Sequence, residues 1–307
     1  MDGILPVWKP AGWTSHDVVA KTRRLLRTKR IGHAGTLDPE VTGVLPLCIG
    51  RATRVVEYMQ ELPKTYEAVL QFGISTDTED LTGEAIRKVE NIQLTESVIR
   101  QTLDSFTGEI EQVPPMYSAV KVDGKRLYEL AREGKVVERK KRRVTVYSIR
   151  LLSMALDLTY PRIAFSVSCS KGTYIRTLCV DIGQALGVPS AMAELKRTES
   201  AGLKEADCLT LEEIGQLQES GQLQARLLPA DAVLSQMPSH TVLEQDAAVC
   251  AVQGKQIAFR AVNPLPREDG FMRLYDSSGT FLGIYEALSG QDRIRPVKVF
   301  ASADTLR

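Results

Sequence analysis

The sequence predicts a mixed α+β protein with a large sheet-rich region, flanking helices and a small C-terminal β-barrel. Apolar and polar residues alternate over Thr65–Gly73 and over Ile163–Cys169, as in strands with one buried face. Apolar residues recur at helical spacing after Asp17 and after Tyr174. From about Pro238 the segments become short, strand-like and separated by glycine and proline. We therefore expect a domain with a mixed, largely antiparallel sheet over residues 1–237 and a barrel over residues 238–307.

Further elements follow from the same patterns. In the first domain we expect helices near Arg54–Glu61, Thr95–Phe106 and Arg126–Glu133, strands over Tyr117–Val122 and Arg143–Leu152, and a turn at Asp123-Gly124. In the barrel we expect strands over Ala248–Val252, Gln256–Arg260, Phe271–Asp276 and Thr280–Ala287.

The composition is that of an ordinary globular protein. The 307 residues are 43% hydrophobic and 25% charged, enough for one large and one small domain. No window approaches the roughly 20 apolar residues that cross a bilayer, and the first residues do not resemble a secretory signal. The five cysteines are scattered, without a CxxC pair, which indicates reduced thiols rather than a zinc site. We expect a cytoplasmic protein without a membrane-bound segment.

The net charge of +1 hides an uneven distribution. Residues 1–200 hold 29 Lys and Arg against 24 Asp and Glu, whereas residues 201–307 hold 10 against 14. Two clusters carry the basic excess: residues 21–30 have six cations and no anion, and residues 135–143 have six cations and one anion. Such clusters suit a polyanion such as a phosphate backbone, although a basic run is more often only a solvated face.

The segment Gly32–Pro46, GHAGTLDPEVTGVLP, is neither a helix nor a central strand, because it holds three glycines and two prolines. It is a shaped loop with one central carboxylate, Asp38, which the following Pro39 restricts to extended geometry. A rigid surface turn and a functional loop are both consistent with this composition.

Two other residues are unusually placed. Tyr66 lies at the start of a predicted strand, where an aromatic side chain packs in a core or lines a cleft. Arg176 lies at the start of a predicted helix, where the helix dipole disfavours a cation. We therefore expect a carboxylate partner near Arg176.

Together these segments resemble the bacterial TruB-type tRNA pseudouridine-55 synthases over nearly the whole chain. The matching segments are Lys9-Pro10-x-Gly12-x-Thr14-Ser15, the loop GHAGTLDPEVTGVLP, Lys64-Thr65-Tyr66-Glu67, Ser170-Lys171-Gly172-Thr173-Tyr174-Ile175-Arg176-Thr177 and Leu195-Lys196-Arg197-Thr198. One departure is Arg54, where relatives often have lysine. The C-terminal Val252-x-Gly254 and Asp276-x-x-Gly279-x-Phe281-Leu282-Gly283 resemble a PUA domain, a small RNA-binding barrel.

The resemblance implies an isomerase that converts uridine 55 in the T loop of tRNA to pseudouridine. Asp38 would be the catalytic carboxylate, attacking either the uracil ring or the ribose anomeric carbon. Tyr66 would stack on the flipped base, and Arg176 would pair with Asp38. The expected substrate-binding residues are His33, Tyr174, Leu195 and Lys9.

Physical chemistry is consistent with these roles. Extruding a base from a folded loop costs a few kcal/mol, and stacking on an aromatic residue returns roughly 1–3 kcal/mol of that cost. An arginine partner favours the charged form of a carboxylate in a dry pocket. The isomerisation needs no cofactor and no metal.

The expected partner is the T arm of tRNA, without DNA or membrane, and the expected state is a monomer. A non-catalytic tRNA-binding or RNA-folding protein is the alternative. An aspartate-nucleophile phosphatase would need a second aspartate where Glu40 stands.

Overall fold

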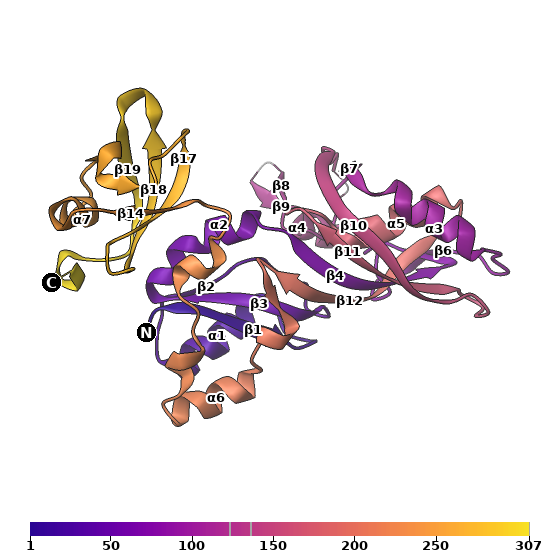
Figure 1. Ribbon diagram of the computed structural model, residues 1–307. Helices are drawn as coiled ribbons and strands as arrows, with labels where there is room; N and C mark the ends of the chain where they lie inside the picture. The colour runs from indigo at the N-terminus through magenta and orange to yellow at the C-terminus, as the bar shows by residue number, and fades with distance from the viewer. Residues whose placement is uncertain (123, 136, 307) are drawn as a thin grey trace.

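The computed structural model describes residues 1–122, 124–135 and 137–306. The turn predicted at Asp123-Gly124 therefore lies partly outside the described residues. The chain forms one large sheet with flanking helices and a separate C-terminal sheet (Figure 1). The α+β architecture predicted from the sequence is confirmed.

The large sheet has nine strands in the described part of the chain, with the main order β1-β3-β12-β4-β11-β10-β7. Strand β2 extends it beside β3, and β13 beside β12. Its pairs are antiparallel except β3 with β12, which run parallel. The strands are β1 (Gly3–Lys9), β2 (Ile31–His33), β3 (Thr42–Ile49), β4 (Lys64–Phe72), β7 (Gly108–Gln112), β10 (Arg142–Ala155), β11 (Arg162–Cys169), β12 (Ser190–Ser200) and β13 (Leu203–Lys204).

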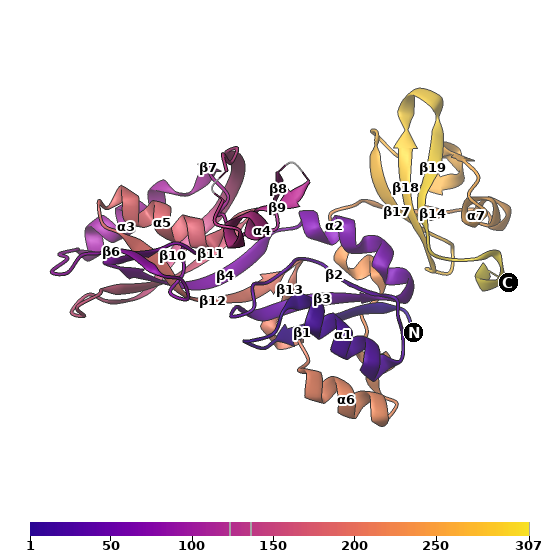
Figure 2. The ribbon, with the colours of Figure 1, turned by 180° about the vertical axis from the view of Figure 1, so that it is seen from behind.

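Helices cover the sheet and close two hydrophobic cores. Helices α3 (Glu96–Ser105) and α5 (Ile175–Ala185) pack against the central strands through their apolar stripes. Helices α1 (Ser15–Leu26) and α6 (Leu211–Glu219) pack near β1 and β3 in both views (Figures 1 and 2). Each of α1 and α6 begins with a capping box, at Thr14 and Thr210, which satisfies free N–H groups at the helix start.

Shorter elements complete this part of the chain. They are β5 (Ile74–Thr76), β6 (Ala85–Lys88), β8 (Lys121–Val122), β9 (Lys125–Arg126), α4 (Leu127–Arg132), the 3-10 helix η1 (Gly50–Val55), α2 (Val56–Glu61), η2 (Glu205–Asp207), η3 (Leu223–Arg226) and η4 (Ala230–Val233). The strand predicted over Tyr117–Val122 is wrong for most of its length, because only Lys121 and Val122 pair, with β9.

The C-terminal region is a nearly closed barrel of six strands in the order β15-β19-β18-β17-β14-β16. The strands are β14 (Ser239–Val242), β15 (Ile257–Ala258), β16 (Val262–Asn263), β17 (Gly270–Tyr275), β18 (Phe281–Leu288) and β19 (Arg293–Val299). The short 3-10 helices η5 (Phe259–Ala261), η6 (Ser289–Gln291) and η7 (Ala303–Leu306) connect and follow them.

The barrel differs from the prediction in several elements. Strands β14 and β19 were not predicted, and the strand expected over Gln256–Arg260 is limited to Ile257 and Ala258, because Phe259 begins a 3-10 helix. The segment expected to be a strand over Ala248–Val252 is part of helix α7 (Gln245–Val252). Alanine is the best helix former, and Ala248 and Ala251, three residues apart, form the buried side of this helix. The apolar run was too short for its period to separate a strand from a buried helix.

The barrel packs directly on the large domain. Ile284 and Phe300 of the barrel belong to the same apolar cluster as Val233 and Leu234. Polar contacts reinforce this packing, because Arg51 Nη1 donates to the Phe300 carbonyl at 2.7 Å. No helix within residues 1–122, 124–135 and 137–306 is long and apolar enough to cross a membrane.

Candidate active site

The loop that carries Asp38 joins β2 to β3. It is shorter than the loop predicted over Gly32–Pro46, because Gly32 and His33 belong to β2 and Thr42–Pro46 belong to β3, where Pro46 pairs with Pro6 of β1. Strand β3 begins at Thr42, and the next residue, Gly43, pairs with Arg197 of β12. A side chain at Gly43 would meet the Arg197 backbone, since a Cβ there would lie 2.2 Å from the Arg197 oxygen. Gly43 has φ of +123°, which favours glycine. This glycine therefore lets the end of the loop pass close to the sheet.

Asp38 and Arg176 form an ion pair. Arg176 Nη2 lies 2.9 Å from Asp38 Oδ2, and the side chains are 7% and 50% exposed, respectively. Two carbonyls hold the guanidinium as well, because Nη1 donates to Thr78 O at 3.0 Å and Nη2 to Tyr117 O at 2.9 Å. The carboxylate partner expected for a cation at the start of α5 is thus present. The buried arginine is fixed, whereas the carboxylate stays open to a substrate.

Tyr66 is the third residue of β4, at the centre of the sheet. Its register partners are Val167 in β11 and Arg197 in β12, so it lies across β12 from Gly43 and the end of the Asp38 loop. The side chain is partly buried and packs against the core of the large sheet. Burial raises the pKa of its hydroxyl. Core packing and a cleft position are both compatible with this burial, and stacking on a base stays a prediction.

Leu195 borders the same core, whereas Tyr174 lies at the start of the helix that carries Arg176. Leu195 in β12 pairs with Ala68 in β4, two residues along the strand from Tyr66, and is partly buried. Tyr174 is the residue before α5, and its backbone N–H and C=O are both hydrogen-bonded to the side-chain amide of Gln112. Gln112 Nε2 donates to Tyr174 O at 3.2 Å, and Tyr174 N donates to Gln112 Oε1 at 3.0 Å. These two bonds fix the start of the helix that carries Arg176.

His33 ends strand β2, immediately before the loop. Its ring contacts His16 edge-on, with 5.5 Å between the ring centroids. Its Nδ1 atom is buried without a hydrogen-bond partner among the described residues. Burial, and then the charge of His16, lowers the pKa of His33. The ring therefore sits neutral at the edge of the loop with a polar atom still to be satisfied.

Lys9 is completely buried, and its ammonium supports the loop. Nζ donates to Pro10 O at 2.9 Å, Trp13 O at 2.5 Å and Pro39 O at 2.8 Å. The last bond holds the residue that follows Asp38. Burial lowers the pKa of Lys9 to about 8. The geometry gives Lys9 a role in holding the loop, while the predicted contact with substrate stays a prediction.

Arg197 is the residue that sequence reasoning left without a role. It is 1% exposed and donates from Nε to Val44 O at 2.8 Å and from Nη2 to Gly35 O at 3.0 Å. Gly35 precedes Asp38 and Val44 follows it, so the Arg197 guanidinium is hydrogen-bonded to the chain on both sides of Asp38. No acidic side chain in the described part of the chain pairs with Arg197. Arginine is rarely buried without such a partner, which is why its place in a strand did not reveal this role.

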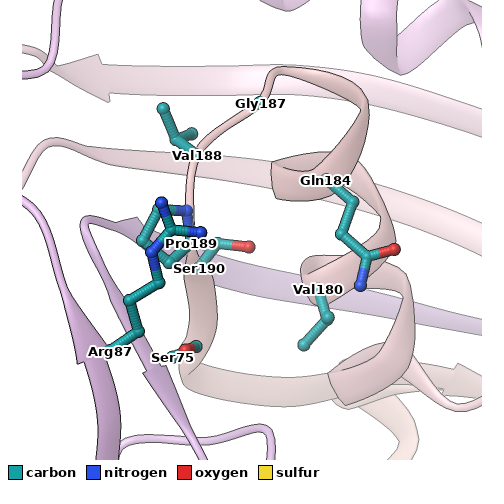
Figure 3. Close-up of a pocket in the computed structure, with 8 residues that line it drawn as sticks. All are labelled: Ser75, Arg87, Val180, Gln184, Gly187, Val188, Pro189 and Ser190. Atoms are coloured by element: carbon teal, nitrogen blue, oxygen red, sulfur yellow. The ribbon is translucent and has the colours of Figure 1, made fainter.

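Of the residues expected to form the site, Arg176 and Lys9 therefore contact the loop directly, and His33 precedes it. Tyr66 and Leu195 lie on the neighbouring strands β4 and β12. A cavity of about 310 Å³ lies elsewhere, between the β5–β6 hairpin and the end of α5 (Figure 3). Arg87, Ser75 and Gln184 line it, and it contains none of the expected site residues. Within the described residues there is no group of three or more His, Cys, Asp or Glu side chains that could hold a metal ion.

Comparisons with known proteins identify the family. Residues 23–175 match the model of the TruB family pseudouridylate synthase N-terminal domain, and residues 176–235 match the tRNA pseudouridylate synthase B C-terminal domain. The chain is 46% identical over 314 residues to tRNA pseudouridine synthase B of Halalkalibacterium halodurans, covering 98% of both chains. It is 45% identical over 304 residues to the protein of that name from Staphylococcus aureus, covering 97% of this chain and 99% of that one.

The fold comparison extends further. A chain in the crystal structure of a Cbf5-Nop10-Gar1 complex aligns with a TM-score of 0.76 and 27% identity, over 99% of this chain and 86% of that one. A chain in the structure of an H/ACA RNP bound to a substrate RNA aligns with a TM-score of 0.75 and 25% identity, over 99% and 88%. Because the sequence match covers nearly the full length at well over 40% identity, this chain belongs to the TruB family of pseudouridylate synthases.

Proposed function

We propose that this protein is a tRNA pseudouridine synthase B, which isomerises uridine 55 of the tRNA T loop to pseudouridine. The relatives that carry this name match along nearly the whole chain. The observation that carries the proposal is the pair of Asp38 and Arg176, a half-exposed carboxylate held by a buried guanidinium. A protein that only binds RNA has no need of such a pair.

The reaction moves a base without any change of oxidation state. The bond from ribose C1′ to uracil N1 breaks, a bond from C1′ to C5 forms, C5 loses a proton, and N1 gains one. We propose Asp38 as the nucleophile, since half of its side chain faces solvent and a bound substrate can reach it. Attack on the uracil ring and attack on the ribose carbon both remain open routes for this carboxylate.

Arg176 is proposed to hold the carboxylate in position while the substrate excludes water. An ion pair is stronger in a site closed off from solvent than at an open surface. The carbonyls of Thr78 and Tyr117 prevent the guanidinium from following the substrate away from Asp38. The cation at the start of α5, unfavourable for the helix, thus has a use in the site.

The detached base needs a surface that holds it while it turns. We propose that Tyr66 stacks on it and that Leu195 and Tyr174 border the same pocket. Tyr66 and Leu195 lie on neighbouring strands and pack on one core, which makes this wall rigid. His33, at the entrance to the loop, is proposed to contact the T loop through the part of its side chain that stays exposed.

We further propose that the catalytic domain spans residues 1–237, that the barrel spans residues 238–307, and that the T arm is the part of tRNA bound at the site. The chain is proposed to act as a monomer, because Asp38, Tyr66 and Arg176 all come from one chain.

The test is the substitution Asp38→Asn, which keeps the shape of the side chain and removes its charge. We expect no pseudouridine in an unmodified tRNA transcript, as mapped by carbodiimide labelling and primer extension, while tRNA still binds. Glu40→Gln is the matched control, because Glu40 is an exposed acid of the same loop. Pseudouridine formation at the wild-type rate by Asp38→Asn would contradict the proposed role of Asp38 as the nucleophile. Failure of trace wild-type protein to modify an excess of tRNA would instead favour the RNA-folding alternative.

A further inference from the structure

Helix α1 ends in a basic surface that the proposed chemistry does not use. This surface, the α1 patch, comprises Arg23, Arg24, Arg27, Lys29 and Arg30. All five residues are exposed, and none forms an ion pair within the described residues. Only two of their side chains make hydrogen bonds: Arg23 to Ile31 O at 2.8 Å and Arg30 to Thr53 Oγ1 at 3.1 Å. Lys21, nearer the start of the helix, instead borders a groove beside Glu212.

The second basic run is different, because neighbouring acids neutralise much of it. Lys135 pairs with Glu133 at 2.7 Å, Lys141 with Glu111 at 3.5 Å, and Arg143 with Glu109 at 3.5 Å. Arg139 donates to the Pro114 carbonyl at 2.9 Å. The two runs looked equivalent in sequence, but the uncompensated positive charge lies mainly on the α1 patch.

Stabilisation of α1 accounts for only part of this charge. Arg23 and Arg24 lie in the last turn of the helix, where cations offset the negative end of the dipole. Arg27 is the C-cap residue of the helix, whereas Lys29 and Arg30 lie beyond it, where the effect of the dipole falls off. Three adjacent like charges without partners repel one another, so this surface suits an external anion.

The patch has a rigid connection to the Asp38 loop. At the start of α1, Ser15 Oγ accepts a hydrogen bond from Leu37 N at 2.9 Å, directly before Asp38. The helix has 12 residues. Its axis is therefore about 18 Å long, and the patch lies at the far end of the helix from the Asp38 loop. An RNA in contact with both the loop and the patch must extend well beyond the target base.

We propose that the α1 patch binds phosphates of the substrate tRNA on the helical segment that continues beyond the T arm. This inference rests on the proposed function for its substrate and adds a second point of contact to the site. The patch raises the rate of productive encounter and positions the long RNA, whereas the chemistry remains with Asp38. Arginine suits this contact because its planar group binds phosphate through two donors.

The experiment removes three charges whose side chains make no internal hydrogen bonds: Arg24→Gln, Arg27→Gln and Lys29→Gln together. The matched control removes three exposed cations on β6 and β10, namely Arg87→Gln, Lys88→Gln and Arg150→Gln. Pseudouridine formation and Kd are measured over a series of salt concentrations with two RNAs. One is a full-length tRNA transcript, and the other is a short hairpin with only the T loop and its stem.

With full-length tRNA we expect kcat/KM of the triple variant to fall roughly ten- to a hundredfold at low salt, with kcat unchanged. The slope of log Kd against log salt should become shallower by about 2 to 3, since each lost phosphate contact removes about one unit. With the short hairpin, and with the control variant on either RNA, both quantities should stay at wild-type values. The charge-keeping variant Arg24→Lys, Arg27→Lys should behave like wild type, and thermal unfolding verifies that each variant is folded.

Unchanged kcat/KM and Kd for full-length tRNA would overturn the proposal, and so would an equal loss with the hairpin, which would place the contact within the T arm. These outcomes are distinct from failure of the proposed function. In that case wild-type protein would form no pseudouridine in either RNA, and the Kd values would still decide whether the α1 patch binds the longer RNA.

Discussion

The cations around the Asp38 loop and those of the α1 patch are the same residue types in opposite environments. Lys9, Arg176 and Arg197 are at most 6% exposed, and each donates to two or three fixed oxygens. The residues of the α1 patch are exposed and have no ionic partner among the described residues. Positive charge in this protein therefore has two uses. The buried cations hold the Asp38 loop in place, and the exposed cations of the α1 patch attract a polyanion.

The difference predicts how each group responds to substitution. A buried polar group that loses its partner costs about 1–3 kcal/mol, and a buried charge that loses its partner costs more. A substitution on an exposed surface usually changes stability by no more than about 0.5 kcal/mol. Changes at the buried cations should thus affect kcat and folding at any salt concentration, whereas changes in the α1 patch should affect only salt-dependent binding.

The largest effect is expected for Arg176→Met, which removes the partner of Asp38 and keeps much of the side-chain length. A lost contribution of about 3–4 kcal/mol to the transition state corresponds to a fall in kcat of roughly a hundred- to a thousandfold. Single-turnover pseudouridine formation with saturating tRNA measures it, with the exposed Arg150→Met as control. A variant with wild-type kcat would show that the ion pair is only structural.

A smaller effect on catalysis and a larger one on folding are expected for Arg197→Met. The substitution leaves the carbonyls of Val44 and Gly35 without their donor, which should lower the free energy of unfolding by about 2–4 kcal/mol. Urea denaturation measures it, and Arg24→Met in the α1 patch should change the same quantity by less than about 0.5 kcal/mol. If Arg197→Met and Arg24→Met lowered the free energy of unfolding equally, the buried and the exposed cations would not differ in their contribution to stability.

The last prediction concerns the pH dependence of stability due to Lys9, whose pKa burial lowers from 10.5 to about 8. Between these two values the unfolded chain binds more protons than the folded protein, so the free energy of unfolding rises with pH across that window. Below pH 8 the folded protein bears the full cost of the buried charge. Lys9→Met lacks this contribution, so the stability of wild type relative to the variant should increase from pH 7 to pH 10. Parallel stability curves would show that Lys9 keeps its ordinary pKa.

The elements with a strong period or a strong composition could be predicted from the sequence. Alternation over Thr65–Gly73 and Ile163–Cys169 gave β4 and β11 nearly to the residue. Helix α7 and the strands β14 and β19 were mispredicted or missed, because short apolar or mixed-charge segments take their conformation from what they pack against. The barrel fold was recognised despite these errors, since its glycines and prolines mark the turns between strands.

The site shows the same division. Asp38 could be singled out because it is the central acid of a loop rich in glycine and proline. A carboxylate partner for Arg176 could be predicted because a cation at the start of a helix is disfavoured by the helix dipole. The use of Lys9 and Arg197 as buried supports of the loop had no counterpart in the sequence pattern, because lysine and arginine are expected at the surface. Nor did the pattern show which basic run has acidic partners, since Glu109 and Glu111 lie on another strand, β7.

By itself the sequence determined the mixed α+β class, the central acid of the loop, the basic clusters and the resemblance to a family. These depend on the period of side chains, the backbone limits of glycine and proline, and local composition. Only the tertiary structure decided which cations meet which oxygens. The register of β12 against β3 and β4 places Arg197 between Gly43 and Tyr66, and the docking of α5 brings Arg176 to Asp38. Such contacts join segments far apart in the chain, and their strength depends on burial that no local pattern records.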